Sequence, residues 1–174
     1  MMSPQPLDSL DVDLLRALRE RPRAGVLELS RVLRVARGTV QARLDRLERT
    51  GIITGYGPDV DLAAAGYPVQ AFVSLEIAQG ALDDVTAALT ALPAVVEAYV
   101  TTGSSDVLCR LAAASHEELR DALLALNRSP EVARSTSVVV LSVLVAPRTL
   151  PLLADRARSA PRRAPNYRDS ADGD

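Results

Sequence analysis

Hydrophobic residues recur at helical spacing in three short stretches near the N-terminus. The first stretch carries Leu10, Leu14, Leu15 and Leu18. The second begins after Gly25 and carries Val26, Leu29, Val32 and Leu33. The third, over residues 37–49, places Val40, Leu44 and Leu47 on a single stripe. This spacing predicts three amphipathic helices, the last two joined by a turn near residues 34–37.

The segment 51–56, Gly-Ile-Ile-Thr-Gly-Tyr, follows the third predicted helix. Its first glycine predicts a helix stop, and the apolar pair behind it predicts a short strand that serves as a wing or as a connecting strand. Three short helices with such a break match a winged helix-turn-helix. We therefore assign residues 1–56 to a DNA-binding domain and residues 57–68 to a linker.

From residue 69 the hydrophobic period alternates between that of strands and that of helices. The expected strands are 69–77, 95–101, 107–112 and 135–145, and the expected helices are 82–92 and 116–127. Ser115 and Glu118 have the spacing of a capping box at the start of the second helix. Similar residues recur at an offset of 37 residues, as in Leu82 and Leu119 or Pro93 and Pro130. The pattern predicts an α+β protein whose second domain, residues 69–147, is a ferredoxin-like βαββαβ unit with two helices on one face of the sheet.

The last predicted strand is apolar on both of its faces over residues 138–145. One face of the sheet therefore lacks a cover, and a homodimer that packs sheet against sheet would supply it. A two-fold dimer would also present two reading heads to a pseudo-palindromic DNA site.

Composition narrows the class of protein. Of the 174 residues 48% are apolar, which is typical of a globular chain and excludes disorder throughout. No run reaches the roughly eighteen apolar residues of a membrane span, and residues 1–10 lack a signal-peptide pattern, so we expect a cytoplasmic protein without a membrane partner. The single cysteine, Cys109, is expected to be a buried small side chain. Residues 148–174 hold several prolines and arginines, and we expect a disordered tail, either solvated or in loose contact with phosphate.

Charge divides the chain more clearly than its net value of −2 indicates. Residues 1–60 hold 10 Arg against 8 acidic residues, whereas residues 61–147 hold 4 against 10. Within residues 31–49, six Arg stand against two acidic residues. This local excess suits a polyanion, although a solvated helix face has the same pattern.

The third predicted helix holds the candidate DNA contacts, because the second helix of the motif enters the major groove by its N-terminal half. The groove-facing candidates are Arg37, Gly38, Thr39, Gln41 and Ala42. Arg and Gln form bidentate hydrogen bonds with guanine and adenine, and small residues let the backbone approach the bases. The remaining DNA-binding candidates are Arg34, Arg43, Arg46 and Arg49. Of these, Arg34, Arg46 and Arg49 suit contacts with phosphate. A three-helix motif that contacts only protein is the alternative.

Several short pieces in this order resemble the Lrp/AsnC (feast/famine) regulators. They are Leu7-Asp8, Asp11, Leu14-Leu15, Glu28-Leu29, Thr39-Val40, Arg43, Leu47-Glu48, residues 51–53, Gly55-Tyr56, Leu62 and Gly66. Two positions depart from the family pattern. Arg34 stands in the inter-helix turn where a glycine is usual, and Ala36 replaces the serine that would cap the recognition helix. A lost cap costs about 1 kcal/mol, and a residue other than glycine strains a turn that needs a positive φ.

The second domain resembles the family's regulatory (RAM) domain, whose Thr-Gly-x-x-Asp signature stands here at residues 102–106. The resemblance implies a small effector such as an amino acid, bound near this turn, and assembly of dimers into tetramers or octamers. By resemblance the effector site holds Thr102, Gly103, Asp106 and Ser137. A plain hairpin in which Asp106 caps its own backbone is the alternative.

Two other functions are compatible with this two-domain plan. Some proteins of this two-domain plan are enzymes that use histidine chemistry, but this chain offers only His116 and no Ser/His/Asp set, metal cluster or phosphate loop. We therefore expect neither an enzyme nor a cofactor or metal. The other alternative is a small-molecule sensor or partner subunit of the same fold without specific DNA binding, which the departures at Arg34 and Ala36 would favour.

Overall fold

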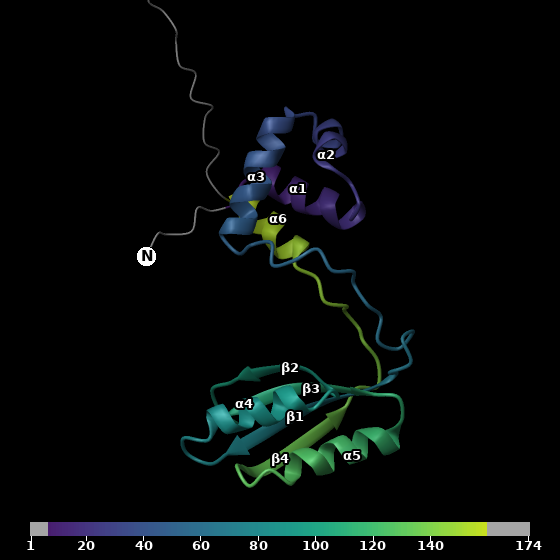
Figure 1. Cartoon of the computed structure of the whole chain (residues 1–174), viewed down its shortest axis with the longest axis vertical. Helices are drawn as coiled ribbons and strands as arrows, with labels where there is room; N and C mark the ends of the chain where they lie inside the picture. The colour runs from purple at the N-terminus through teal and green to yellow at the C-terminus, as the bar shows by residue number, and fades with distance from the viewer. Residues whose placement is uncertain (1–6, 160–174) are drawn as a thin grey trace, which may run out of the picture. The chain divides into compact units, whose positions relative to one another are not determined.

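The computed structural model describes residues 7–159, which form two compact units. The first unit joins the segment up to Pro58 with the segment from Ala146 onward, and the second holds Asp59–Val145. Figure 1 shows the helices of the first unit and the sheet of the second, and each unit is described by itself.

Three helices form the core of the first unit: α1 (Ser9–Glu20), α2 (Val26–Leu33) and α3 (Arg37–Arg49). Their bounds confirm the helical spacing found in the sequence. Leu14, Leu29, Val40 and Leu47 are each no more than 1% exposed and form the shared core. A continuous apolar stripe on each short helix therefore packs against the other two, which is where most of the stability of short helices originates.

The expected strand within residues 51–56 is absent from the described structure, although the helix stop is confirmed. Gly51 has φ +70°, which ends α3 in the left-handed region. The backbone N–H groups of Ile52 and Ile53 both donate to the Leu47 carbonyl, at 2.9 and 3.1 Å. Because these groups close the end of the helix and Ile53 packs on the core, they are not available to a strand.

The expectation of disorder from residue 148 is wrong for residues 150–159, which form helix α6 (Leu150–Ser159). The helix packs on α1 within the first unit. Its half-buried residues are Leu150, Leu153, Ala154 and Ala157. This spacing is a helical stripe that the abundance of Pro and Arg obscured. Pro151 lies in the first turn, where proline removes no intrahelical hydrogen bond. The rest of the predicted tail lies outside the described residues.

The second unit is a four-stranded sheet of order β2-β3-β1-β4. Its strands are β1 (Val69–Ile77), β2 (Val95–Val100), β3 (Val107–Ala113) and β4 (Val132–Val139), and its helices are α4 (Leu82–Ala91) and α5 (His116–Asn127). All neighbouring strands are antiparallel. The βαββαβ prediction is confirmed. Ser115 caps α5 by accepting from the Glu118 N–H at 3.1 Å, while the Glu118 carboxylate accepts from Ala114, not from Ser115.

The two helices cover one face of this sheet, where Val73, Leu75 and Leu111 are completely buried (Figure 1). Cys109 belongs to this core at 1% exposure, as expected, and burial raises the pKa of its thiol to about 11. The last strand differs from the prediction, since β4 begins at Val132 and ends at Val139. The backbone beyond it leaves the sheet after the Val140 N–H donates to Gln70.

The opposite face of the sheet carries apolar side chains that no helix covers. Phe72 is paired with Val138 in the register, and the two side chains are 43% and 64% exposed. The segment 140–145, which follows β4 outside the sheet, is also apolar and exposed, with Leu141 at 98% and Leu144 at 93% exposure. Scattered apolar residues are ordinary on a protein surface, but a contiguous group of this kind marks an interaction site.

Candidate nucleic-acid interface

The turn between α2 and α3 is the first element of the candidate interface. Arg34 ends α2 with φ 56° and ψ 43°, in the left-handed region. Its N–H and that of Val35 both donate to the Ser30 carbonyl, the Val35 contact being 3.1 Å long. Val35 packs on the core of the unit. The strain expected at Arg34 from the sequence is therefore present, because arginine has a Cβ that this conformation disfavours.

Helix α3 begins at Arg37 without a side-chain cap. Ala36 has the extended conformation of an N-cap residue, with φ −62° and ψ 147°, but has no side-chain oxygen to accept from the first turn. The amides at the start of α3 are thus free of a capping side chain. An uncapped helix N-terminus facing solvent presents N–H groups and the positive end of its dipole to an anion.

The N-terminal half of α3 is open to solvent on the side away from the core. Arg37, Gly38, Thr39, Gln41 and Ala42 are all exposed. A Cβ added to Gly38 would meet no atom within 4 Å, so this part of the helix surface is uncovered. The structure brings the five groove-facing candidates together on one helix face. The Gln41 amide donates to Asp45 at 2.7 Å and would have to exchange that bond for a base.

The four remaining DNA-binding candidates divide into two pairs. Arg34 and Arg49 are exposed. Arg43 and Arg46, by contrast, are 25% and 22% exposed at their side chains and form ion pairs with α1. Arg46, which was expected to suit phosphate, and Arg43, a general DNA-binding candidate, are therefore both engaged by carboxylates of their own unit.

An acidic pair at the start of α1 holds the two arginines. Arg43 Nη1 donates to Asp8 at 2.7 Å and to Asp11 at 2.6 Å, and Arg46 Nη2 lies 2.5 Å from the Asp11 carboxylate. Asp8 and Asp11 also cap α1 reciprocally, through bonds of 2.9 and 3.0 Å to each other's backbone N–H. Asp11 is only 1% exposed.

The pKa directions agree with this geometry. Burial disfavours the charged form of Asp11, but hydrogen bonds from Arg46, from the Asp8 backbone and from Arg43 outweigh it and lower the pKa of the carboxyl. For Arg43 burial also opposes the charge, and the hydrogen bonds to Asp8 and Asp11 outweigh it and raise the pKa. In the sequence these two acids appeared only among the residues that resemble the family pattern, and their ion pairs with α3 were not predicted.

The candidate effector turn lies between β2 and β3. Gly103 has φ +123°, which confirms the need for glycine in the turn. The Asp106 carboxylate accepts from the Ile77 N–H at 2.8 Å, and its own N–H donates to Leu75 at 2.9 Å. Asp106 therefore caps the end of β1 and not, as the alternative held, its own backbone. Thr102 and Gly103 are exposed beside it.

Ser137 does not join this turn within one chain. It is paired with Val73, four residues along β1 from the Ile77 amide that Asp106 binds. Four residues of strand span about 13 Å. The four effector candidates therefore form one group of three and a separate, exposed serine on the edge strand.

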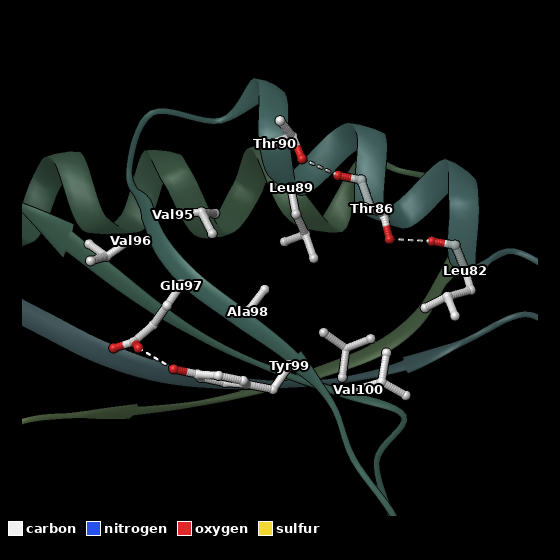
Figure 2. A pocket seen from close by; sticks show the side chains of 11 residues that line it. Leu82, Thr86, Leu89, Thr90, Val95, Val96, Glu97, Ala98, Tyr99 and Val100 are labelled. Atoms are coloured by element: carbon white, nitrogen blue, oxygen red, sulfur yellow. Dashed lines mark hydrogen bonds between the residues drawn. The ribbon is translucent and has the colours of Figure 1, made fainter. Parts of the chain in front are cut away.

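A groove of about 410 Å³ lies between α4 and the edge strand β2 (Figure 2). Its wall includes Leu89, Val96 and Val100, and none of the expected effector residues. The hydroxyls of Thr86 and Thr90 donate to carbonyls of their own helix, at 2.7 Å each. The groove thus offers apolar surface and few unengaged polar groups. Sequence reasoning did not foresee it.

Within residues 7–159 no group of His, Cys, Asp or Glu side chains is arranged to hold a metal ion. None of the helices in the same range is long and apolar enough to cross a membrane.

Two family models match the chain in the same order as its two units. A winged helix-turn-helix DNA-binding model matches residues 7–54, and a model described as the Lrp/AsnC ligand binding domain matches residues 70–150. Among curated relatives, the transcriptional regulator Rv2324 of Mycobacterium tuberculosis is 34% identical over 80% of this chain and 95% of its own length. The regulatory protein AsnC of Escherichia coli is 31% identical over 78% of this chain and 90% of its own.

Solved structures agree with these matches. The structure of E. coli AsnC has a TM-score of 0.78 at 27% identity and covers 84% of this chain and 100% of that chain. The transcriptional regulator NMB0573 of Neisseria meningitidis, solved in complex with L-Met, has a TM-score of 0.76 at 26% identity and covers 84% and 97%.

Proposed function

The chain belongs to the Lrp/AsnC family of DNA-binding transcriptional regulators, and we propose that it reads a pseudo-palindromic operator as a homodimer whose binding responds to an amino acid or a similar small effector. The family assignment confirms the predicted winged helix-turn-helix followed by a ligand-binding βαββαβ domain, and it places the chain among regulators, not enzymes. The observation that carries the proposal is the exposed, uncapped N-terminal half of α3.

Base recognition is assigned to Arg37 and Gln41 in this proposal. Both side chains are exposed on the first turns of α3, and both can form bidentate bonds in the major groove. Gly38 and Ala42 lie beside them on the exposed side of α3 and would allow the helix backbone to approach the bases. Arg34 and Arg49 would bind the flanking phosphates, which position the helix without reading sequence.

Dimerisation is assigned to the uncovered face of the sheet. Phe72, Val138 and the segment 140–145 supply the apolar area, and a second copy of the same surface satisfies the symmetry of a two-fold dimer. Further assembly into tetramers or octamers is part of the proposal, as is a cytoplasmic location, where the operator would be found.

The effector is assigned to the turn at Thr102, Gly103 and Asp106. The left-handed Gly103 exposes backbone amides that suit a carboxylate, and an Asp106 carboxylate could accept from an ammonium group. A regulator of similar fold was solved with L-Met, which supports an amino acid as the first class to test. Because Ser137 lies about 13 Å away along the sheet of one chain, it would contribute only from a second copy.

A titration of the full chain against labelled DNA tests the DNA-binding proposal. The native fragment from upstream of its own gene is compared with a scrambled fragment at two salt concentrations, with and without a panel of amino acids. We expect tighter binding to the native fragment and weakening with salt. Arg37→Ala and Gln41→Ala should lower the preference for the native fragment, whereas Arg120→Ala on the exposed face of α5 is the matched control. Equal affinity of the wild-type chain for operator candidates and scrambled DNA would favour the sensor without specific binding.

Sedimentation tests the dimer separately. Val138→Asp should yield monomers, because it places a charge in the apolar sheet face. Leu124→Asp is the control, since Leu124 is similarly exposed on α5, on the helix-covered side. Dimers of the Val138 variant with wild-type stability would refute this choice of interface.

A further inference from the structure

The ion pairs between α1 and α3 involve a carboxylate that is almost completely buried. Asp11 is 1% exposed, and its Oδ1 lies 2.6 Å from Arg43 Nη1 and 2.5 Å from Arg46 Nη2. Its Oδ2 accepts from the Asp8 N–H at 3.0 Å. Every described side-chain contact of this carboxylate therefore comes from the cap of its own helix or from the recognition helix.

Both arginines project from the same helix, three residues apart. Two guanidinium groups on a single carboxylate oxygen restrain the rotation of α3 about its axis more tightly than either contact alone. A buried ion pair contributes little net stability, since desolvation of the charges offsets their attraction. In some proteins such pairs specify one arrangement of the elements they join, and here one of the joined elements is the helix that is proposed to read DNA.

The same contacts determine how many positive charges α3 offers to DNA. The side chains of Arg43 and Arg46 remain 25% and 22% exposed, so they lie at the edge of the contact between α1 and α3 and within reach of solvent. Arg49, on the same helix, is exposed and forms no ion pair within the described residues. An arginine released by Asp11 could bind phosphate wherever the helix meets DNA, whatever the sequence.

We propose that Asp11 is a positioning residue for DNA recognition: by holding Arg43 and Arg46 it orients α3 and withholds two guanidinium groups from phosphate, and it thereby limits binding to non-specific DNA. The inference rests on the proposed DNA-binding surface. Loss of a merely structural residue would weaken DNA binding. Loss of the Asp11 charge should instead strengthen binding to non-specific DNA.

The salt dependence of binding to a scrambled fragment measures this effect. Each phosphate neutralised by an arginine adds about 0.9 to the slope of log affinity against log salt concentration. Asp11→Asn should steepen the slope by about one to two and tighten binding to scrambled DNA at low salt. Glu20→Gln makes the same charge change at an exposed site of α1 and should leave the slope unchanged. An equal slope for Asp11→Asn and the wild type would overturn the proposal.

A second comparison holds even where the Asp11 variant fails to fold. Arg49→Gln removes an exposed arginine and should flatten the slope by about 0.9, while Arg46→Gln removes one that Asp11 withholds and should leave the slope unchanged. Equal flattening by both substitutions would contradict the proposal. Where Asp11→Asn folds, the double variant Asp11→Asn/Arg46→Gln should have a shallower salt slope on scrambled DNA than Asp11→Asn alone.

These slopes are measured on scrambled DNA, so they separate this inference from the proposed function. A wild-type chain that shows no preference for any native fragment would refute operator recognition, and the slopes would still decide whether Asp11 withholds the arginines. A preference for native DNA combined with unchanged slopes in both comparisons would leave the regulator in place and refute the role of Asp11.

Discussion

Replacing Arg34 by glycine should stabilise the first unit, although it removes a side chain from the proposed interface. Arg34 is the only residue other than glycine with a positive φ in the described chain, at 56°. Its side chain is exposed, so the substitution removes no core packing. The substitution therefore acts through the conformational energy of the backbone at position 34, which glycine lowers in the left-handed region.

The expected magnitude is a difference of two opposing effects. A residue with a Cβ loses about 1–2 kcal/mol in the left-handed region, and glycine does not. Glycine in turn gives the unfolded chain more freedom, which costs about 0.4–1 kcal/mol. Arg34→Gly should therefore raise the free energy of unfolding by about 0.5–1 kcal/mol.

Native-state hydrogen exchange of the α3 amides provides the assay, because it reports on this unit without requiring the whole chain to unfold. Protection in Arg34→Gly should rise about two- to five-fold if these amides exchange through opening of the unit. Arg34→Ala is the matched control: it removes the same side chain but keeps the Cβ, and should gain little. A loss of protection in the glycine variant, or an equal gain in both, would refute the argument from backbone strain.

Three further predictions concern the same unit. Ala36→Ser should add the missing N-cap and raise the free energy of unfolding by about 1 kcal/mol, and no gain in urea titrations would contradict it. Because the pKa of Asp11 is lowered in the folded state, its charge stabilises the fold above the ordinary pKa of 3.8, and this contribution is lost as the pH falls through the folded pKa. The difference in free energy of unfolding between wild type and Asp11→Asn should therefore shrink below about pH 4. A constant difference from pH 6 to 3 would exclude this linkage. Leu153→Ala should weaken the contact of α6 with α1 and lower the free energy of unfolding by about 1 kcal/mol, whereas Leu152→Ala, at a mostly exposed position, should have little effect.

The elements with a clear hydrophobic period were predicted closely from the sequence. Strand β1 and helices α2, α3 and α5 have the expected bounds, because each presents one apolar face with the spacing of its own type. The end of β4 was not predictable in this way. Residues 140–145 are as apolar as a strand, but they have left the sheet, and apolar composition alone cannot tell a paired strand from an exposed one.

The candidate site was predicted in part, for a similar reason. Solvent exposure of Arg37 and Gln41 follows from the helical stripe of Val40, Leu44 and Leu47 on the opposite side. The pairing of Arg43 and Arg46 with Asp11 joins residues more than thirty positions apart. No local pattern contains such a contact, so the two arginines had the same appearance as Arg49 until the packing of α1 on α3 was known.

The local signals at the start of the recognition helix are unfavourable, and tertiary contacts have to offset them. Arg34 is in a strained conformation and Ala36 provides no cap, so α3 begins with less intrinsic support than a capped helix preceded by glycine. Its core stripe, the Asp11 ion pairs and the packing of α1 therefore determine whether the helix is held in a reading position. Because α6 packs on α1, and because residues beyond 150 lie outside the matched family models, the helices of the reading head contact a segment that those models do not describe.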